Sequence, residues 1–322
     1  MGNSARKIIA RIGLIFIILL AVCILGFIFF VIRYKINLPG WFSAPSEQLV
    51  DYDKVYKTVD GRDLRMDVYY PTRKLFTRSP TLIYFHGGSW NSGSKKIDDD
   101  VFSSVTEYGL AFISVEYRLT GDNGGYPAFL DDCADAIRFV KKNADELQID
   151  ENRIGVIGAS AGGQISLMMA LNGNSFGSDE NLKDVQFKIK CAVALCAPTD
   201  FLNLDVYEDQ NDRESAAQLL SELFGGSPDE FADDYRAASP VYNIHKKAPP
   251  IFMAHGTKDD IVPVAQADNF YQKAVKAGMK VKYIKVENAN HKFKSTDGGT
   301  TTPSTDSVLD EMKRFLIYEL IL

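Results

Sequence analysis

The feature that most constrains the fold is a regular alternation of short apolar runs with longer amphipathic segments. The short runs are typical of buried strands: Thr81–Phe85, Ala111–Val115, Arg153–Ile157, Cys191–Cys196, Ile251–Ala254 and Val281–Val286. Helical spacing of apolar residues marks the longer segments: Pro127–Lys142, Ala161–Leu171, Val264–Ala277 and Thr305–Leu320. Near-continuous hydrophobicity is expected of parallel strands that are covered on both faces. The pattern therefore predicts an α/β fold with a doubly wound, mostly parallel sheet flanked by helices.

Three further features depart from this alternation: a hairpin, an insertion and a polar loop. Val55–Thr58 and Arg65–Tyr70 flank an Asp-Gly pair, which predicts an antiparallel hairpin at the start of the sheet. Phe201–Asn243 is acidic and mixed in character, and we expect it to be a helical insertion between strands. Ser295–Ser307 is polar and rich in glycine and threonine, so we expect a mobile loop or the edge of a lid.

The N-terminal part of the chain is apolar for the length of a bilayer. No charged residue occurs from Ile12 to Ile32, and these 21 residues would form a helix about 30 Å long. A cleaved signal peptide would have a shorter apolar region and a small-residue exit. A core helix is rarely apolar on all sides over such a length. Residues 1–35 are therefore predicted to be a retained signal anchor, with one transmembrane helix at about 12–32.

The charges beside this run indicate an orientation. Three basic residues precede it (Arg6, Lys7 and Arg11) and two follow it (Arg33 and Lys35), so the amino terminus should stay in the cytoplasm. We expect a single-pass protein of the cell membrane, with a linker at 36–48 and one extracytoplasmic α/β domain at 49–322.

The charge of the remaining chain restricts its partners. The whole chain has 36 Lys and Arg residues against 42 Asp and Glu. Five of the bases and none of the acids precede residue 36, which leaves 31 bases against 42 acids, a net charge of −11. This argues against nucleic acid as a partner.

The cysteines indicate neither disulfides nor a metal. Cys23 lies in the apolar N-terminal run, which leaves Cys133, Cys191 and Cys196 for the domain. Cys191 and Cys196 are five residues apart on a predicted strand, hence on opposite faces and poorly placed to pair. No metal-ligand spacing is found, so no metal is predicted.

A Gly-x-Ser-x-Gly pattern extends from Gly158 to Gly162 (GASAG). A nucleophilic serine projects from a turn too tight for side chains at its flanks, which is why glycines bracket it. The apolar run Arg153–Ile157 ends directly before the pattern, and a helical segment begins directly after Ser160. This strand–turn–helix setting predicts Ser160 as a nucleophile. The alternative is that Ser160 is only the N-cap of a glycine-rich helix start.

The segment HGGSW, from His86 to Trp90, directly follows another predicted strand. Small residues in such a loop let backbone N–H groups approach and stabilise a developing oxyanion. We predict the N–H groups of Gly88 and Ser89 as donors, together with that of Ala161, the residue after the nucleophile. His86 is expected to hold the loop in place. A generic Gly-Gly turn is the alternative.

A nucleophilic serine needs a base, and the chain has only four histidines: His86, His245, His255 and His291. Where a Gly-x-Ser-x-Gly turn supplies the nucleophile, the chain order is nucleophile, acid, histidine. His291 follows the last predicted strand and is therefore the expected base. His255 ends an earlier strand, where the acid is expected, and His245 has a surface or packing role.

The acid that orients His291 is Asp259 or Asp260. Both aspartates follow the strand Ile251–Ala254, about thirty residues ahead of the histidine. Spacing leaves the choice open, because neighbouring side chains point apart.

Five motifs occur together in the order and spacing of one family: HGGSW, VEYRL, GASAGG, SPVYNI and HGTKDDIVP. From about Leu49 to the C-terminus the chain resembles the hormone-sensitive-lipase-like esterases, particularly the acetyl-xylan and feruloyl esterase branch. The resemblance implies an α/β-hydrolase fold without metal or organic cofactor. It also implies that the acid is Asp259, the fifth residue of HGTKDDIVP. Ser89 departs from the pattern, because many members have a third glycine there.

The resemblance implies a serine carboxylic ester hydrolase that acts through an acyl-enzyme on a small or carbohydrate-linked ester. Its residues would be Ser160 as nucleophile, His291 as base and Asp259 as acid. HGG-x-W also occurs in kynurenine-formamidase-like hydrolases, so a formamidase or amidase is an alternative. A catalytically inactive, membrane-displayed binding module is a further one. The expected pocket segments, Asn91–Asp100, Phe201–Tyr242 and Ser295–Ser307, do not indicate the acyl group.

Overall fold

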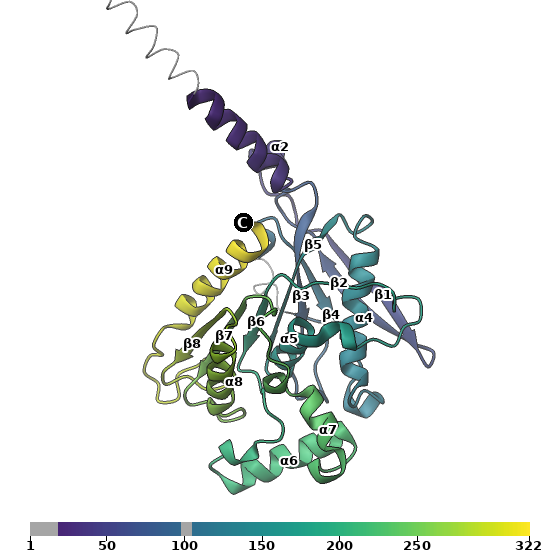
Figure 1. The fold of residues 1–322 in the computed structure, drawn as a ribbon, viewed down its shortest axis with the longest axis vertical. Helices are drawn as coiled ribbons and strands as arrows, with labels where there is room; N and C mark the ends of the chain where they lie inside the picture. The colour runs from purple at the N-terminus through teal and green to yellow at the C-terminus, as the bar shows by residue number, and fades with distance from the viewer. Residues whose placement is uncertain (1–18, 98–104) are drawn as a thin grey trace, which may run out of the picture.

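The computed structural model describes residues 19–97 and 105–322, which form an eight-stranded sheet between layers of helices (Figure 1). The strands in chain order are β1 Val50–Val59, β2 Arg62–Tyr69, β3 Ser79–Phe85, β4 Ala111–Val115, β5 Ile149–Ala159, β6 Ala192–Leu195, β7 Ile251–Gly256 and β8 Val281–Val286. Their order across the sheet is β1-β2-β4-β3-β5-β6-β7-β8. β2 is antiparallel to β1 and β4, and every later pairing is parallel. The predicted mostly parallel sheet and its leading hairpin are confirmed.

Helices cover both faces of this sheet. The longer ones are α4 Ala128–Lys142, α5 Ala161–Asn172, α6 Gln210–Phe224, α7 Pro228–Ala238, α8 Ala265–Lys276 and α9 Thr305–Ile321. Single turns of helix are α2 Leu38–Trp41, η1 Thr120–Asp122, η2 Gly173–Ser175, η3 Leu204–Val206 and η4 Pro240–Tyr242. The four helices predicted from apolar spacing are α4, α5, α8 and α9, each within a residue or so of its expected bounds. The predicted insertion is also helical, and α6 and α7 lie beyond one end of the sheet (Figure 1).

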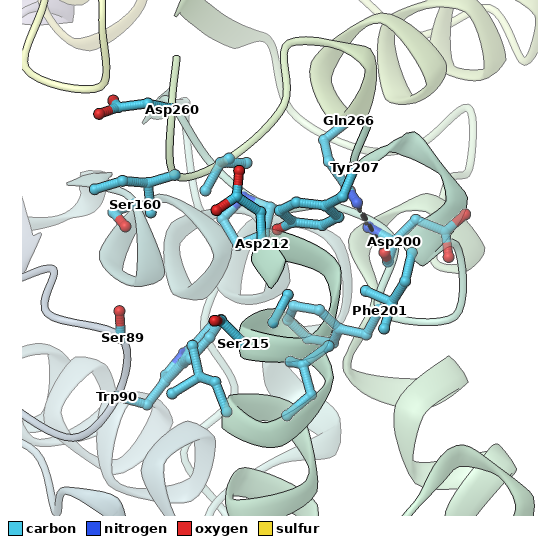
Figure 2. Close-up of a pocket in the computed structure, with 17 residues that line it drawn as sticks. Ser89, Trp90, Ser160, Asp200, Phe201, Tyr207, Asp212, Ser215, Asp260 and Gln266 are labelled. Atoms are coloured by element: carbon cyan, nitrogen blue, oxygen red, sulfur yellow. Dashed lines mark hydrogen bonds between the residues drawn. The ribbon is translucent and has the colours of Figure 1, made fainter. Parts of the chain in front are cut away.

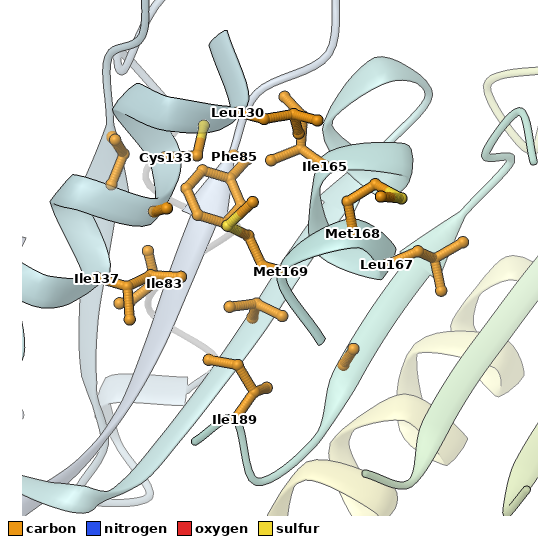
Figure 3. Packing of buried hydrophobic residues seen from close by; sticks show 14 of the residues in the cluster. Ile83, Phe85, Leu130, Cys133, Ile137, Ile165, Leu167, Met168, Met169 and Ile189 are labelled. Atoms are coloured by element: carbon orange, nitrogen blue, oxygen red, sulfur yellow. The ribbon is translucent and has the colours of Figure 1, made fainter. Parts of the chain in front are cut away.

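Two hydrophobic clusters, one on each face, hold the layers together. Because successive side chains of a strand point to opposite faces, Ile83 and Phe85 of β3 belong to one cluster and Leu82 to the other. The first cluster includes apolar residues of α4, α5 and α8, and Figure 3 shows Ile165 of α5 near Phe85. The second is covered by α9, through residues such as Leu316. Full burial of one such side chain stabilises the fold by about 1.5–3 kcal/mol.

A buried ion network joins the antiparallel hairpin to α4. The Nζ atom of Lys57 in β1 lies 2.8 Å from Asp132 Oδ1 and 2.7 Å from Asp135 Oδ2. Arg118 donates to Asp132 from the other side, at 2.8 Å. Asp135 also accepts hydrogen bonds from the backbone N–H groups of residues 178 and 179. The network therefore connects the first strand, α4 and the loop after α5.

The segment before the sheet is in contact with the domain. Residues 19–33 are helical, Ile36 pairs with Phe76, and Trp41 donates to the Leu75 carbonyl at 3.2 Å. Part of the predicted linker thus packs on the domain. Among the described residues, no helix is both long enough and apolar enough to cross a membrane. Residues 12–18 of the predicted transmembrane helix, and the basic residues before it, lie outside the described part, so the anchor stays a prediction.

Candidate active site

The turn between β5 and α5 holds Ser160 in a backbone conformation that a non-glycine residue rarely adopts. Its φ and ψ are 55° and −126°, and its side chain makes no capping hydrogen bond, which disfavours the simple N-cap interpretation. An added Cβ at Gly158 would lie 2.2 Å from the Gly162 oxygen, and one at Gly162 would lie 2.0 Å from the Phe85 oxygen. Only glycine fits at both positions. The sequence forms this tight turn because both flanks lack a side chain.

The loop after β3 lies against this turn. An added Cβ at Gly87 would lie 2.8 Å from the Ala159 oxygen and 3.4 Å from Ser160 Cβ. Gly88 and Ser89 both have positive φ, at 116° and 53°. In the described part of the chain, the N–H groups of these two residues have no hydrogen-bond acceptor. The N–H of Ala161 is in the first turn of α5, where no intrahelical partner exists. These predicted donors therefore lie on two adjoining segments.

His86 supports the loop, as the sequence predicts. Its ring stacks on Tyr117 at 4.2 Å between centroids, and its Nδ1 contacts the Gly87 oxygen at 2.8 Å. Tyr117 in turn donates its hydroxyl to the His86 carbonyl at 2.7 Å. Burial lowers the pKa of His86, so its ring is neutral at pH 7. The side chain of Trp90 donates to Gln164 of α5 at 3.3 Å, which ties the far end of the loop to the helix after Ser160.

His291 and Asp259 lie in contact, although they follow different strands. His291 Nδ1 is 2.9 Å from Asp259 Oδ1 and 2.8 Å from Oδ2. Asp259 also accepts from the backbone N–H groups of Ile261 and Val262, at 3.0 and 2.9 Å. The side chain of Asp260 is exposed and lines a cavity instead. The geometry therefore favours Asp259, which the resemblance implied and spacing left open.

Sequence reasoning missed a second histidine that contacts this acid. His255 Nε2 lies 3.1 Å from Asp259 Oδ2 and 2.8 Å from the Val262 oxygen. His255 was placed only as the residue that ends a strand. Its position four residues before the acid is the signal that could have indicated the contact.

The surroundings of the pair set its charges. Burial raises the pKa of Asp259, but hydrogen bonds from His255 and His291 outweigh this and hold it well below its usual range. For His291, burial lowers the pKa, and the hydrogen bond with Asp259 together with the neighbouring Cys196 raises it overall. A carboxylate that stays ionised near neutral pH stabilises an imidazolium beside it. The pair is therefore suited to accept and hold a proton.

Ser160 makes no hydrogen bond with this pair among the described residues. In the described part of the chain, no hydrogen bond joins its Oγ to the imidazole of His291. A ring nitrogen of His291 lies instead within 4.8 Å of the Sγ of Cys196, directly after β6. In the absence of substrate, catalytic hydrogen bonds are often long or poorly aligned. The catalytic roles of the three residues stay predictions.

Ser160 and Ser89 open into a cavity of about 220 Å³ (Figure 2). The insertion contributes much of its wall, including Phe201, Leu204, Tyr207, Asp212, Ser215 and Leu219. Of the described residues expected to form the pocket, those at 91–97 and 295–307 do not line this cavity. Residues 98–100 lie outside the described part.

The polar loop at 295–307 folds back on its own strand. Thr302 pairs with Glu287 and Ser295 with Ala289, and Asn288 donates to Asp297 at 2.7 Å. Thr305 already belongs to α9. This loop is therefore not a lid edge at the cavity, and its mobility stays a prediction.

A doubly wound sheet with a tight, glycine-flanked serine turn after β5, an aspartate after β7 and a histidine after β8 is the arrangement of the α/β-hydrolase class. Two solved structures share this fold. A truncated carbohydrate esterase from gut microbiota matches 86% of this chain and 99% of its own, with a TM-score of 0.72 and 23% identity. An esterase of Thermogutta terrifontis, solved with butyrate bound, matches 84% of this chain and 94% of its own, with a TM-score of 0.65 and 26% identity.

Residues 66–274 match the model of the BD-FAE family, and the chain belongs to this family. Esterase LipC of Mycobacterium tuberculosis is 28% identical over 236 residues, which cover 71% of this chain and 57% of LipC. An arylesterase of Saccharolobus solfataricus is 31% identical over 137 residues, covering 42% of this chain and 43% of the arylesterase. The chain thus spans little more than half the length of LipC. The family and fold fit the resemblance predicted from the five motifs.

Proposed function

We propose that this protein is a serine carboxylic ester hydrolase that acts through an acyl-enzyme. Ser160 is the nucleophile, His291 the base and Asp259 the acid. The N–H groups of Gly88, Ser89 and Ala161 stabilise the oxyanion. The observation that most supports the proposal is the contact between two loops. The turn that holds Ser160 at positive φ lies against the loop in which the N–H groups of Gly88 and Ser89 have no acceptor among the described residues.

The reaction follows from these positions. His291 takes the Ser160 hydroxyl proton as Oγ attacks the acyl carbon, and Asp259 stabilises the resulting imidazolium. The tetrahedral oxyanion accepts hydrogen bonds from the three N–H groups. The imidazolium then gives its proton to the leaving alcohol, and the neutral imidazole activates a water that releases the acid. For the first step, the ring must come within hydrogen-bond distance of Ser160 Oγ.

The substrate is a small or carbohydrate-linked ester. A cavity of about 220 Å³ has room for a short acyl chain, and its apolar wall includes Phe201 and Leu219. The butyrate bound to the Thermogutta terrifontis esterase is such a short acyl group. The carbohydrate esterase from gut microbiota supports a sugar-linked alcohol.

The test is the replacement Ser160→Ala. Turnover of p-nitrophenyl acetate should fall by about 10³-fold or more, because the variant has no hydroxyl at this turn to form the acyl-enzyme. A fluorophosphonate probe should label the natural chain and not the variant. Ser221→Ala is the matched control, because Ser221 lies on the insertion and does not line the cavity, and it should keep both signals. Retained hydrolysis by Ser160→Ala would refute the assignment, and absence of labelling in the natural chain would favour an inactive binding module.

A formamidase or amidase is the second candidate, favoured by the HGGSW loop. Its nucleophile, base and oxyanion donors would be the same residues. Parallel assays on aryl esters, acetylated xylo-oligosaccharides and N-formylkynurenine separate the two reactions. Preference for the formamide by kcat/KM would replace the ester assignment.

We also propose that the chain is a single-pass protein of the cell membrane with its catalytic domain outside the cytoplasm. The support is the uncharged apolar run from Ile12 to Ile32 and the basic residues before it. Protease added to intact cells should then digest the domain. A domain that is digested only after the cells are lysed would contradict this placement.

A further inference from the structure

Cys196, Asp259 and His291 bring three different metal-ligand groups together. The thiol sulfur, one carboxylate oxygen and one imidazole nitrogen all lie within 4.8 Å of one another. The three residues follow β6, β7 and β8, which are neighbours in the sheet and mutually parallel. The carboxyl ends of parallel strands meet at one edge, so residues far apart in the chain share this position.

A thiolate, a carboxylate and an imidazole are together suitable ligands for Zn²⁺, a borderline-soft divalent cation. Zn²⁺ binds Cys sulfur at about 2.3 Å, and His nitrogen and carboxylate oxygen at about 2.0–2.2 Å. Tetrahedral geometry then requires donor atoms roughly 3.5 Å apart. The three donor atoms, which all lie within 4.8 Å of one another, would adjust around the ion to reach this spacing. A fourth position would be left for water or for a substrate oxygen.

The residues around Asp259 would support a bound metal ion. His255 Nε2 lies 3.1 Å from Asp259 Oδ2, and outer contacts of this kind orient metal-binding carboxylates. In the described part of the chain, the ion-pair partners of Asp259 are histidines, with no lysine or arginine. A thiolate and a carboxylate would together balance the charge of one divalent ion. The His291 side chain is 11% exposed, which leaves a path to the site.

We propose that Cys196, Asp259 and His291 bind Zn²⁺, or Cd²⁺ as its analogue, and that the bound ion inhibits the enzyme. The ion occupies the imidazole that Ser160 requires as its base, and it draws Asp259 into its coordination. It is an inhibitor and contributes nothing to the hydrolytic reaction. The inhibition rests on the proposed function, whereas the metal binding does not.

Binding is tested with Cd²⁺ titrated into the full chain, because cadmium–thiolate bonds give an ultraviolet charge-transfer band. The natural chain should develop the band with one equivalent of Cd²⁺, and Cys196→Ser should not. Cys191→Ala is the matched control, since it removes another buried cysteine beside the same strand, and it should keep the band. Thermal unfolding of Cys196→Ser and Cys196→Ala shows whether each variant is folded. A band of equal strength in folded Cys196 variants, or no band in the natural chain, overturns the proposal.

Inhibition is tested with Zn²⁺ during ester hydrolysis. Zn²⁺ should inhibit the natural chain, and a chelator should restore its activity. The inhibition constant should rise about tenfold or more in Cys196→Ser, because even the loss of an outer contact weakens metal binding by 10–100-fold. Hydrolysis that is insensitive to Zn²⁺ overturns the inhibitory site.

Ser160→Ala separates this proposal from the esterase assignment. The variant should still develop the Cd²⁺ band, because Ser160 is not a ligand. A band without any hydrolysis by the natural chain supports the metal site and refutes the esterase. Loss of the band in folded Ser160→Ala contradicts the three-residue site.

Discussion

At the scale of single residues, two neighbouring aspartates have different environments. Asp259 is enclosed by two histidines and two backbone N–H groups, and Asp260 faces the cavity. The two backbone N–H groups and the contacts with both histidines fix the orientation of this carboxylate, and through it the orientation of His291. This difference leads to a direct test of the acid.

Asp259→Asn should reduce kcat for p-nitrophenyl acetate by about 10³–10⁴-fold, because an amide can neither fix the productive tautomer nor stabilise an imidazolium. Asp260→Asn is the control and should stay within a few-fold of the natural chain. Steady-state kinetics of both purified variants make the comparison. Equal losses in the two variants would show that the acid is misassigned.

At the scale of elements, close backbone contacts hold the turn around Ser160 against β3. An added Cβ at Gly162 would lie 2.0 Å from the Phe85 oxygen, and the rigid strand cannot yield. We expect Gly162→Ala to lower the free energy of unfolding by about 1–3 kcal/mol through overpacking, and to reduce activity by displacing Ser160. Urea unfolding and ester hydrolysis measure the two effects. Gly121→Ala, where an added Cβ meets nothing within 4 Å, should change neither; equal effects at both sites would contradict the argument.

The attachment of the β1–β2 hairpin to α4 depends on the buried side chain of Lys57. Burial lowers the pKa of this lysine, and the paired Asp132 and Asp135 raise it overall, so it remains charged. Lys57→Met leaves both buried carboxylates without their shared cation and should cost about 3–5 kcal/mol of unfolding free energy. Lys54→Met, on the same strand and paired with the exposed Glu146, should cost less than about 1 kcal/mol. Urea denaturation of the two variants measures the loss of unfolding free energy in each. Similar midpoints would show that the buried network stabilises the fold no more than the exposed ion pair does.

At the scale of the whole molecule, Asp150 connects the N-terminal segment to the sheet. It pairs with Lys35 at 3.0 Å and with Arg153 at 3.0 Å. Burial raises the pKa of Asp150, but the hydrogen bond from Lys35 and further contacts lower it overall. A carboxyl whose pKa is lower in the folded state stabilises the fold above its unfolded pKa of about 3.9, and this stability is lost as the pH falls through the folded value.

Asp150→Asn should therefore lower the melting temperature at pH 7, with a difference that shrinks as the pH falls below about 4. Thermal unfolding of both chains across that pH range provides the measurement. The exposed Asp145→Asn is the control and should show a smaller difference at pH 7. A difference for Asp150→Asn that grows toward low pH would reverse the assigned sign.

The sequence alone determined the strands, the helices and the tight turn, which depend on local patterns of residues. Apolar runs marked the parallel strands, helical spacing marked α4, α5, α8 and α9, and glycines on both sides of Ser160 marked the tight turn. These signals are local because burial on two faces, or a forbidden Cβ, constrains the residue types at that position. Chain order then placed His291 after the last strand.

Only the tertiary structure decided which side chains meet across loops. It brought Asp259 rather than Asp260 to His291, placed His255 behind the acid, and built the cavity wall from the helical insertion. It also brought Cys196 to His291, although no spacing in the chain resembles a metal site. Contacts between the ends of neighbouring strands depend on sheet order and loop path. A linear pattern of residues does not encode either of these directly.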